Sequence, residues 1–415
     1  MQTILAPAFE HSPKALQAQS ILKQCVHCGF CTATCPTYQL LGDELDGPRG
    51  RIYLIKEVLE GAKPTEKTQM HLDRCLTCRN CESTCPSGVD YHHLLDIGRE
   101  MVDEAVPRPL HKRALRTLLK HGLVSPWFDR MYRLGLLFRP LMPKVLQDKV
   151  QVPLASGTTP SRTHTRQVLL LEGCVQNTMM PNVASATARV LDAMGIQSVY
   201  APQAGCCGAL AWHLSDGDMA KAQMRNNIDA WWPFIERTNP IEAIVMNASG
   251  CGVMVHDYGH VLQDDPLYKD KAKRVSELCL DLSVYLNQQL ESIPSVIDAE
   301  LAKSLGAVVF HPPCTLQHGQ QIKGVVESLL TRLGFELCAP PKDAHLCCGS
   351  AGTYSVLQQA LSSSLKARKI SHLENTGAAL ILSANVGCIS HLQSATPKPV
   401  LHWIEALDRV MKSAH

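Results

Sequence analysis

The sequence has no apolar run close to the ~20 residues that a membrane-spanning helix requires. Its first residues, Met1–Leu5, lack the basic segment and long apolar core of a secretory signal. The net charge is only +2, so the chain has no overall electrostatic bias toward nucleic acid. These absences predict a cytoplasmic protein with no transmembrane segment and no nucleic-acid partner.

The usual fingerprints of self-contained enzymes are also missing. No G-x-G-x-x-G follows a predicted strand, and no other flavin or nicotinamide motif is visible. No Ser–His–Asp or paired-carboxylate arrangement stands out. We therefore assign no catalytic residue and expect no flavin or nicotinamide on this chain.

Cysteine, by contrast, is far above ordinary use, with 18 in 415 residues. In a cytoplasmic protein such an excess indicates metal or cluster binding and not disulfides. The length is sufficient for two or three domains of ~100–200 residues each.

Eight of these cysteines form two copies of C-x2-C-x2-C-x3-C-P, which end at Pro36 and Pro86. This motif supplies thiolates to [4Fe–4S] clusters, whereas zinc needs only C-x2-C pairs. Three cysteines of a copy can wrap one cluster, while the fourth points toward the neighbouring cluster. The sequence therefore predicts one cluster on Cys25, Cys28, Cys31 and Cys85, and a second on Cys75, Cys78, Cys81 and Cys35.

The segments around the two motifs are predicted to be helical. Apolar residues recur at helical spacing from Ile52 to Leu59, and further helices are expected over 65–74 and 91–106. This pattern favours the helical type of two-cluster ferredoxin domain. Arg49 and Arg51 could raise the reduction potential of a cluster through their charge, but the pattern favours solvated residues at a helix start.

The next segment, 107–165, is predicted to be a basic connector. Apolar and aromatic residues are interleaved with the charges, and 153–166 reads as a linker. Three interpretations stay open: a helix packed on its own domain with a solvated basic face, a docking site for a partner subunit, or a helix on an anionic membrane surface. From Val106 to Val150 the charged residues are Arg108, Lys112, Arg113, Arg116, Lys120, Arg130, Arg133, Arg139, Lys144 and Lys149, opposed by Asp129 and Asp148.

From Gln167 onward a strand–helix alternation occurs twice, which implies parallel sheets covered by helices. Each unit has a single Cys, a Cys-Cys-Gly and a final Cys, each just past a predicted strand, where open α/β sheets bind ligands. Such thiolate groups suit a soft metal or a cluster, which makes either unit a possible third centre. The two sets are Cys174, Cys206, Cys207 and Cys251, and Cys314, Cys347, Cys348 and Cys388.

The expected architecture is therefore multidomain. A helical two-cluster domain occupies 1–106, the connector 107–165, and the two α/β units 166–262 and 304–415, with a mostly helical bridge at 263–303. His311 and His318 flank Cys314 and could be ligands, although capping or packing roles are favoured. Cys279 and Cys338 match no repeat position and are expected to be ordinary buried thiols.

The two α/β units resemble the cysteine-rich CCG domain of heterodisulfide reductases, whose motif runs Cys…Cys-Cys-Gly…Cys-x-x-Cys. Both copies depart from it, because Ala248 and Asn385 replace the first Cys of the last pair. Pro312 also stands where some relatives carry another Cys. The missing ligand argues against the unusual cluster of those reductases, but four thiolates could still hold a cubane cluster or zinc.

Over nearly its whole length, apart from 107–165, the chain resembles the iron–sulfur subunits of glycolate oxidases. The resemblance is carried by Cys25–Lys56, His71–Pro86, Asn226–Pro233 and Leu346–Tyr354. It implies an electron-transfer subunit whose flavoprotein partner carries FAD and oxidises glycolate to glyoxylate. Electrons would pass to a membrane acceptor such as quinone, with the chain peripheral on the cytoplasmic face of the inner membrane.

Alternative functions belong to proteins with related layouts. Iron–sulfur subunits of D-lactate or anaerobic glycerol-3-phosphate dehydrogenases share the arrangement but match the quoted stretches less well. A CCG reductase of the heterodisulfide reductase type would act on its substrate directly, which the missing Cys disfavours. Docking modules with a purely structural metal are the third possibility. In the favoured interpretation the chain is not catalytic alone.

Overall fold

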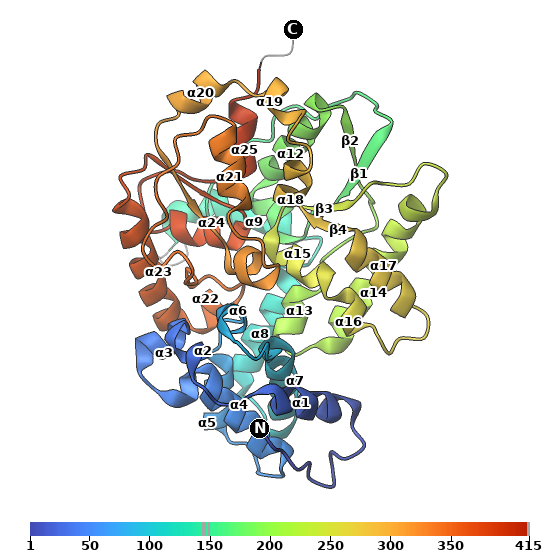
Figure 1. Cartoon of the computed structure of the whole chain (residues 1–415), viewed down its shortest axis with the longest axis vertical. Helices are drawn as coiled ribbons and strands as arrows, with labels where there is room; N and C mark the ends of the chain where they lie inside the picture. Colours follow the sequence, from blue (N-terminus) through green and yellow to red (C-terminus); the bar gives the residue numbers. More distant parts are fainter. Residues whose placement is uncertain (143–146, 148–149, 413–415) are drawn as a thin grey trace.

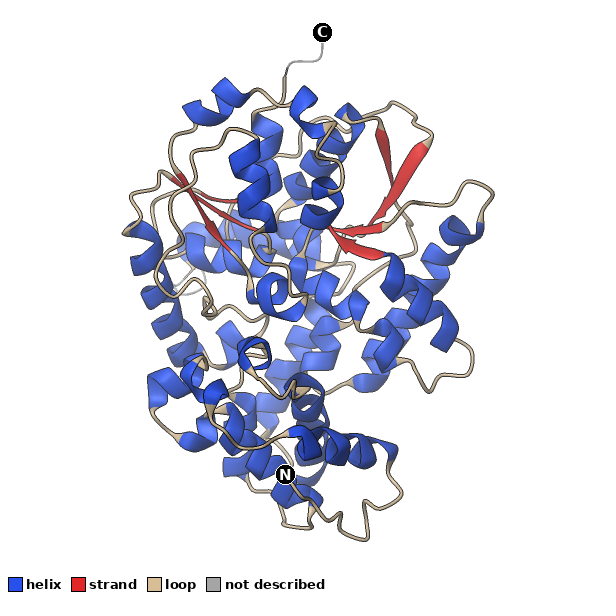
Figure 2. Ribbon diagram, in the orientation of Figure 1, coloured by secondary structure: helices blue, strands red, loops and turns tan. Residues whose placement is uncertain are grey.

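Helices make up the N-terminal part of the described chain, and the strands follow from Arg166 onward (Figure 2). The computed structural model describes residues 1–142, 147 and 150–412. The first eight helical elements confirm the predicted helical type of two-cluster domain. They are α1 (Pro13–Gln24), α2 (Phe30–Ala33), α3 (Pro36–Leu41), η1 (Glu44–Asp46), α4 (Pro48–Leu59), α5 (Glu66–Asp73), α6 (Asn80–Thr84) and α7 (Tyr91–Ala105).

Local sequence explains where these helices begin. Proline occupies the first turn of α1, α3 and α4, where its fixed φ is favourable and its missing N–H costs nothing. The apolar stripe of α7, including Leu94 and Leu95, is buried against α1, α4 and α5. Gly98 on α7 allows close approach to Ile55 on α4, because a Cβ at this glycine would lie 2.5 Å from Ile55 Cγ1.

The connector forms α8 (Leu110–Gly122), α9 (Phe128–Phe138) and η2 (Arg139–Leu141). Part of its positive charge holds it to the protein, since Arg108 binds Asp73 and Asp103 at 2.6 and 2.5 Å. Lys120 likewise pairs with Asp216 of the first α/β unit. The leucines of α8 point the other way, and Leu110 and Leu118 are largely exposed. Lys144, Asp148 and Lys149 lie outside the described residues.

The chain from Arg166 onward contains two separate, wholly parallel sheets, as the strand–helix alternation predicted. The first sheet has the order β2-β1-β3-β4 and the second β5-β6-β7. Their strands are β1 (Arg166–Leu170), β2 (Ile196–Val199), β3 (Ile244–Met246), β4 (Cys279–Asp281), β5 (Val308–His311), β6 (Leu380–Ser383) and β7 (Val400–His402).

Helices cover both sheets (Figure 1). Those of the first unit are α11 (Val175–Met179), α12 (Pro181–Ala193), α13 (Ala209–His213), α14 (Gly217–Glu236), α15 (Ser249–His256) and α16 (Tyr258–Val261). Those of the second unit are η3 (Thr315–Gly319), α21 (Val325–Arg332), α22 (Tyr354–Leu357), α23 (Gln359–Glu374), α24 (Val386–Gln393) and α25 (Trp403–Arg409).

The segment 263–303 does more than bridge the two units. It holds α17 (Lys269–Leu278), α18 (Leu282–Asn287), α19 (Ile293–Val296) and α20 (Ala299–Ser304). Between α17 and α18, however, β4 pairs with β3 and completes the first sheet. The pair β4–α18 has the same place in the first unit as β7–α25 in the second. The first unit therefore extends past residue 262.

The two units pack as near-equivalent halves of one body. α12 of the first unit contacts α25 of the second, and α18 of the first contacts α21 of the second. Shorter elements make further contacts between the units: α15 contacts η3, and α11 contacts α24. One hydrophobic core runs from Val168 and Leu170 to Val308 and Phe310. The loops at the carboxyl ends of both sheets consequently lie near one another.

The helical domain docks on these loops through the second cysteine motif. Asn80 at the start of α6 donates to His345 O (3.3 Å), and Tyr354 donates to Arg74 O (3.1 Å). On the first unit, Arg79 pairs with Asp257 at 2.7 Å. The second motif therefore lies at the interface where the helical domain meets both α/β units.

The close contact of α4 and α7 yields a test of this packing. Gly98→Ala places a methyl group against Ile55 and should destabilise the protein by about 1–3 kcal/mol, the usual range for overpacking. Gly122→Ala in α8 is the control, since the nearest atom to its Cβ is 3.9 Å away. Thermal unfolding should show a lower midpoint for Gly98→Ala alone, and equal midpoints would contradict the assigned contact.

Candidate iron–sulfur and metal sites

The first motif surrounds a cavity of about 460 Å³ beside α2 and α4. Its lining includes Cys25, Cys28 and Cys31 of the first motif, together with Cys81 and Cys85 of the second. Cys28 is exposed, and so are the neighbouring side chains of Val26 (69%) and Phe30 (62%). This cavity therefore lies close to the molecular surface.

A second cavity, of about 300 Å³, lies next to the first and shares Cys81, Tyr91 and Pro48 with it. It is lined by Cys75, Cys78 and Cys81 of the second motif and by Cys35 of the first. Each cavity thus gathers three cysteines of one motif and the fourth cysteine of the other. Four thiols around one space fit the ligand requirement of a [4Fe–4S] cluster.

The two motifs share an unusual backbone shape. His27 and Gly29 in the first motif have φ of 55° and 84°, and Thr77 and Arg79, at the matching places in the second, have φ of 54° and 56°. Left-handed backbone is uncommon for residues other than glycine and is held only where the surroundings impose it. The repetition at both motifs indicates that this geometry serves to turn the cysteines inward.

Burial disfavours free thiolates at these positions. It raises the pKa of Cys31 to about 11, and it raises the pKa values of Cys78 and Cys81 well above the usual thiol range. Iron binds the thiolate form, so cluster assembly would have to release protons from these groups. Buried, unpaired thiols crowded in one place fit a metal cluster better than an apolar core.

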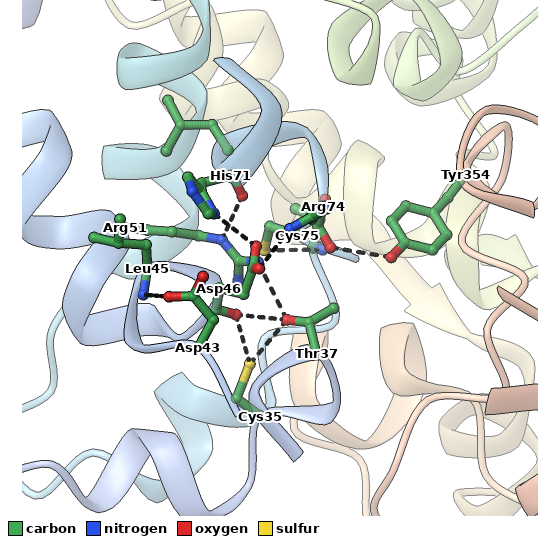
Figure 3. Close-up of polar contacts among 12 residues, drawn as sticks. Cys35, Thr37, Asp43, Leu45, Asp46, Arg51, His71, Arg74, Cys75 and Tyr354 are labelled. Carbon is green, nitrogen blue, oxygen red and sulfur yellow. Dashed lines mark hydrogen bonds and ion pairs between the residues drawn. The ribbon is translucent and has the colours of Figure 1, made fainter. Parts of the chain in front are cut away.

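A buried charge network borders the second cavity (Figure 3). Asp46 is fully buried and accepts from Arg74 Nη1 (2.7 Å), while His71 Nδ1 lies 3.0 Å from the same carboxylate. Arg51 Nη2 lies 3.6 Å from Asp46 and donates to Thr37 Oγ1, and Arg51 Nε donates to His71 O.

Arg51 corrects one prediction. It was expected to be a solvated residue at a helix start, but its exposure is 0%. Burial opposes its charge, yet the adjacent Cys75, Tyr91, Cys35 and Asp46 raise the pKa of its guanidinium above the usual value. Arg49 does lie near the surface, where it pairs with Glu44 at 2.6 Å.

Sequence reasoning missed Asp46 and His71. The chain carries no spacing signal for a contact between residues so far apart, and the two elements meet only in the folded domain.

The four cysteines of the first α/β unit lie in a chain of contacts. Cys206 contacts Cys174 and Cys207, and Cys207 contacts Cys251. These thiols, with backbone N–H groups at the start of α13, hold the pKa of Cys206 well below the usual thiol value. The structure thus brings together all four cysteines that the repeat singled out.

The four cysteines of the second unit are grouped similarly and are all buried. Cys347 contacts Cys314 and Cys348, and Cys348 contacts Cys388. Cys314 also lies near Cys78 of the second cavity, within one buried cluster that includes Leu76 and Tyr354. The thiols of the second unit are therefore neighbours of the second cavity.

The two histidines beside Cys314 differ. His318 is engaged, with Ser83 Oγ 2.8 Å from Nδ1 and His345 O 2.8 Å from Nε2, in line with a packing role. His311 is buried, and its ring lies against the sulfur of Cys348, with which it interacts. Of the remaining thiols, Cys279 is buried, as predicted, whereas Cys338 is only half-buried, and both lie against backbone carbonyls.

Comparison with protein families agrees with this division of the chain. A model of the 4Fe-4S dicluster domain matches residues 21–89. A model of the cysteine-rich CCG domain matches twice, at 168–256 and 308–393. A hypothetical protein from Helicobacter pylori has a related fold, with a TM-score of 0.50 at 11% identity over 89% of this chain and 68% of that chain. At this identity the likeness concerns the fold alone.

Sequence relatives cover the full length. The glycolate oxidase iron-sulfur subunit of Escherichia coli is 52% identical over 99% of this chain and 100% of its own length. The probable glycolate oxidase iron-sulfur subunit of Bacillus subtilis is 29% identical over 90% and 88%. Lactate utilization protein A of Bacillus pumilus is 27% identical and aligns with only 58% of this chain. The chain belongs to the family of glycolate oxidase iron–sulfur subunits.

Proposed function

We propose that this chain is the electron-transfer subunit of a flavin-dependent glycolate oxidase. It would receive electrons from FAD on a partner flavoprotein, where glycolate becomes glyoxylate, and pass them toward a membrane acceptor of the quinone class. The observation that carries the proposal is the pair of adjacent cavities, each lined by three cysteines of one motif and the fourth cysteine of the other, with Cys81 lining both. The name of the Escherichia coli relative is the support for glycolate as the substrate.

The residues of this chain have separate tasks in the proposal. When bound, the two [4Fe–4S] clusters supply one-electron carriers. The thiols of Cys25, Cys28, Cys31 and Cys85 would hold one, and those of Cys75, Cys78, Cys81 and Cys35 the other. The exposed rim of Val26 and Phe30 offers a contact surface for a redox partner at the first cavity. The four-cysteine sets of the α/β units remain candidates for a third centre, either a cluster or zinc.

Activity of the purified complex tests this function. The complex should reduce a quinone analogue with glycolate about tenfold or more faster than with D-lactate, the discrimination that one methyl group provides. Glycerol-3-phosphate serves as a second comparison. The isolated chain should show no glycolate oxidation, because the proposal places the flavin on the partner. Oxidation by this chain alone, or co-purification with a heterodisulfide reductase subunit, would overturn the proposal.

The crossed ligation can be tested separately. Cys35→Ser should selectively weaken the electron paramagnetic resonance signal of the second centre, and Cys85→Ser that of the first. Cys28→Ser and Cys78→Ser provide reference spectra, because each of these cysteines lines only one of the two cavities. If Cys35→Ser gave the spectrum of Cys28→Ser, the assignment of the fourth ligands would be wrong.

The connector supports peripheral association with the cytoplasmic face of the inner membrane. No helix among the described residues is both long and apolar enough to span a membrane. The outward face of α8 and α9 nevertheless exposes Leu118 (68%), Trp127 (61%) and Met131 (63%), with Arg113 and Arg130 also exposed. Apolar side chains beside basic ones suit the boundary of an anionic bilayer.

Co-sedimentation with vesicles tests this surface. The chain should bind vesicles that contain anionic lipid. Combined Trp127→Ser and Met131→Ser substitution should lower the affinity about tenfold, because two apolar side chains that enter the bilayer contribute at least 1.4 kcal/mol to the binding free energy. Leu267→Ser is the control, since Leu267 is exposed (78%) on the first α/β unit. If the double variant instead loses its flavoprotein partner and keeps vesicle binding, the surface docks a subunit.

A further inference from the structure

The buried donors of the second α/β unit are set closer together than the ligands of a cluster would be. One ligand atom each of His311, Cys348 and Cys388 lies within 4.8 Å of the other two. In a cubane the thiolates are bound to different iron atoms, which separates them. Ligands of a single zinc ion share one metal at about 2.0–2.3 Å and so lie about 4 Å apart or less. The spacing therefore favours a single ion.

His311 is placed for this role by the sheet and is not used for anything else there. It ends β5, where its backbone pairs with Ser383 of β6 and its carbonyl accepts from Ser383 Oγ (2.9 Å). Its exposure is 1%, and its ring interacts with the sulfur of Cys348. A thiol is a weak hydrogen-bonding group, so it compensates poorly for the water that the buried imidazole has lost. A metal ion at the adjacent thiols would satisfy it.

The first unit lacks these features. Leu171 stands before Cys174 at the place that His311 holds before Cys314, and it is packed in the apolar core. The helix side chain bonded to the loop around the Cys pair also differs. It is the neutral Asn227 in the first unit, bonded to Cys206 O, and the cationic Lys369 in the second, bonded to Asp343 O. A buried cation suits a neighbouring group of thiolates.

We propose that the second α/β unit binds one zinc ion through His311, Cys348 and Cys388, with Cys347 as the fourth ligand. Cys347 contacts Cys348 but lies outside the group of three, so its sulfur has to move toward the ion to complete a Cys₃His set, a common donor set of structural zinc. The first unit holds no such ion. The proposal narrows the third centre to one unit and one class of metal, and it does not depend on which substrate the complex oxidises.

Metal analysis of the full-length chain tests the proposal. The purified protein should contain about one zinc, besides about eight irons from the two N-terminal sites. His311→Leu, which introduces the residue of the first unit, should reduce zinc at least tenfold and leave the iron content unchanged. Cys207→Ser in the first unit is the matched control and should retain the zinc.

A second variant separates ligation from folding. His311→Cys should keep the zinc, and X-ray absorption at the zinc edge should change from one nitrogen and three sulfur ligands to four sulfurs. This result would hold even if His311→Leu failed to fold. Absence of zinc from the purified chain, retention of zinc by a folded His311→Leu, or an equal loss in Cys207→Ser would each overturn the assignment. So would extra iron that disappears with Cys348→Ser.

Discussion

The arrangement of the two cysteine motifs depends on one buried carboxylate. Asp46 closes η1, after the first motif, and is bound by His71 and Arg74 at the end of α5, just before the second. Its backbone oxygen also accepts from Thr37, two residues past Cys35. A buried charge is tolerated only when it is paired, so this network strongly favours a single relative position of the motifs. The fourth cysteine of each motif can thereby face the cavity of the other.

The same network makes the two sites electrically different. Arg51 brings a permanent positive charge to the lining of the second cavity, with no water to screen it. Such a charge stabilises the additional electron of a reduced centre. Arg49 lines the first cavity and is likewise paired with a carboxylate, but it is partly exposed, so solvent screens its charge more than that of Arg51. The two cavities therefore differ in the charge beside them, although nearly identical motifs form them.

The sequence predicted those features that short-range patterns encode. Motif spacing identified the cysteine groups, and alternating strands and helices identified the parallel sheets. It could not place Arg51, because a basic residue at a helix start is ordinarily solvated and its burial depends on Asp46. It likewise could not show that β4 belongs to the first sheet, since three residues of strand within a helical segment carry no clear period. The position of His311 beside the thiols of Cys348 and Cys388 emerges only from its surroundings in the folded chain.

The two α/β units also differ from each other, as the two cavities of the helical domain do. The two units pack as equivalent halves, so symmetry alone would present the same thiol group twice to the helical domain. Cys78 of the second cavity nevertheless adjoins Cys314 of the second unit, the half that has gained His311 and Lys369. The unit that carries His311 and Lys369 is therefore also the unit whose thiols adjoin the second cavity. A compact ion there would stiffen the loop of Cys347, which lies against Leu76 and Tyr354 at the docking surface. Holding that surface rigid fixes the second cavity in place, which gives the duplicated domain a structural reason to keep thiols without the full cluster motif.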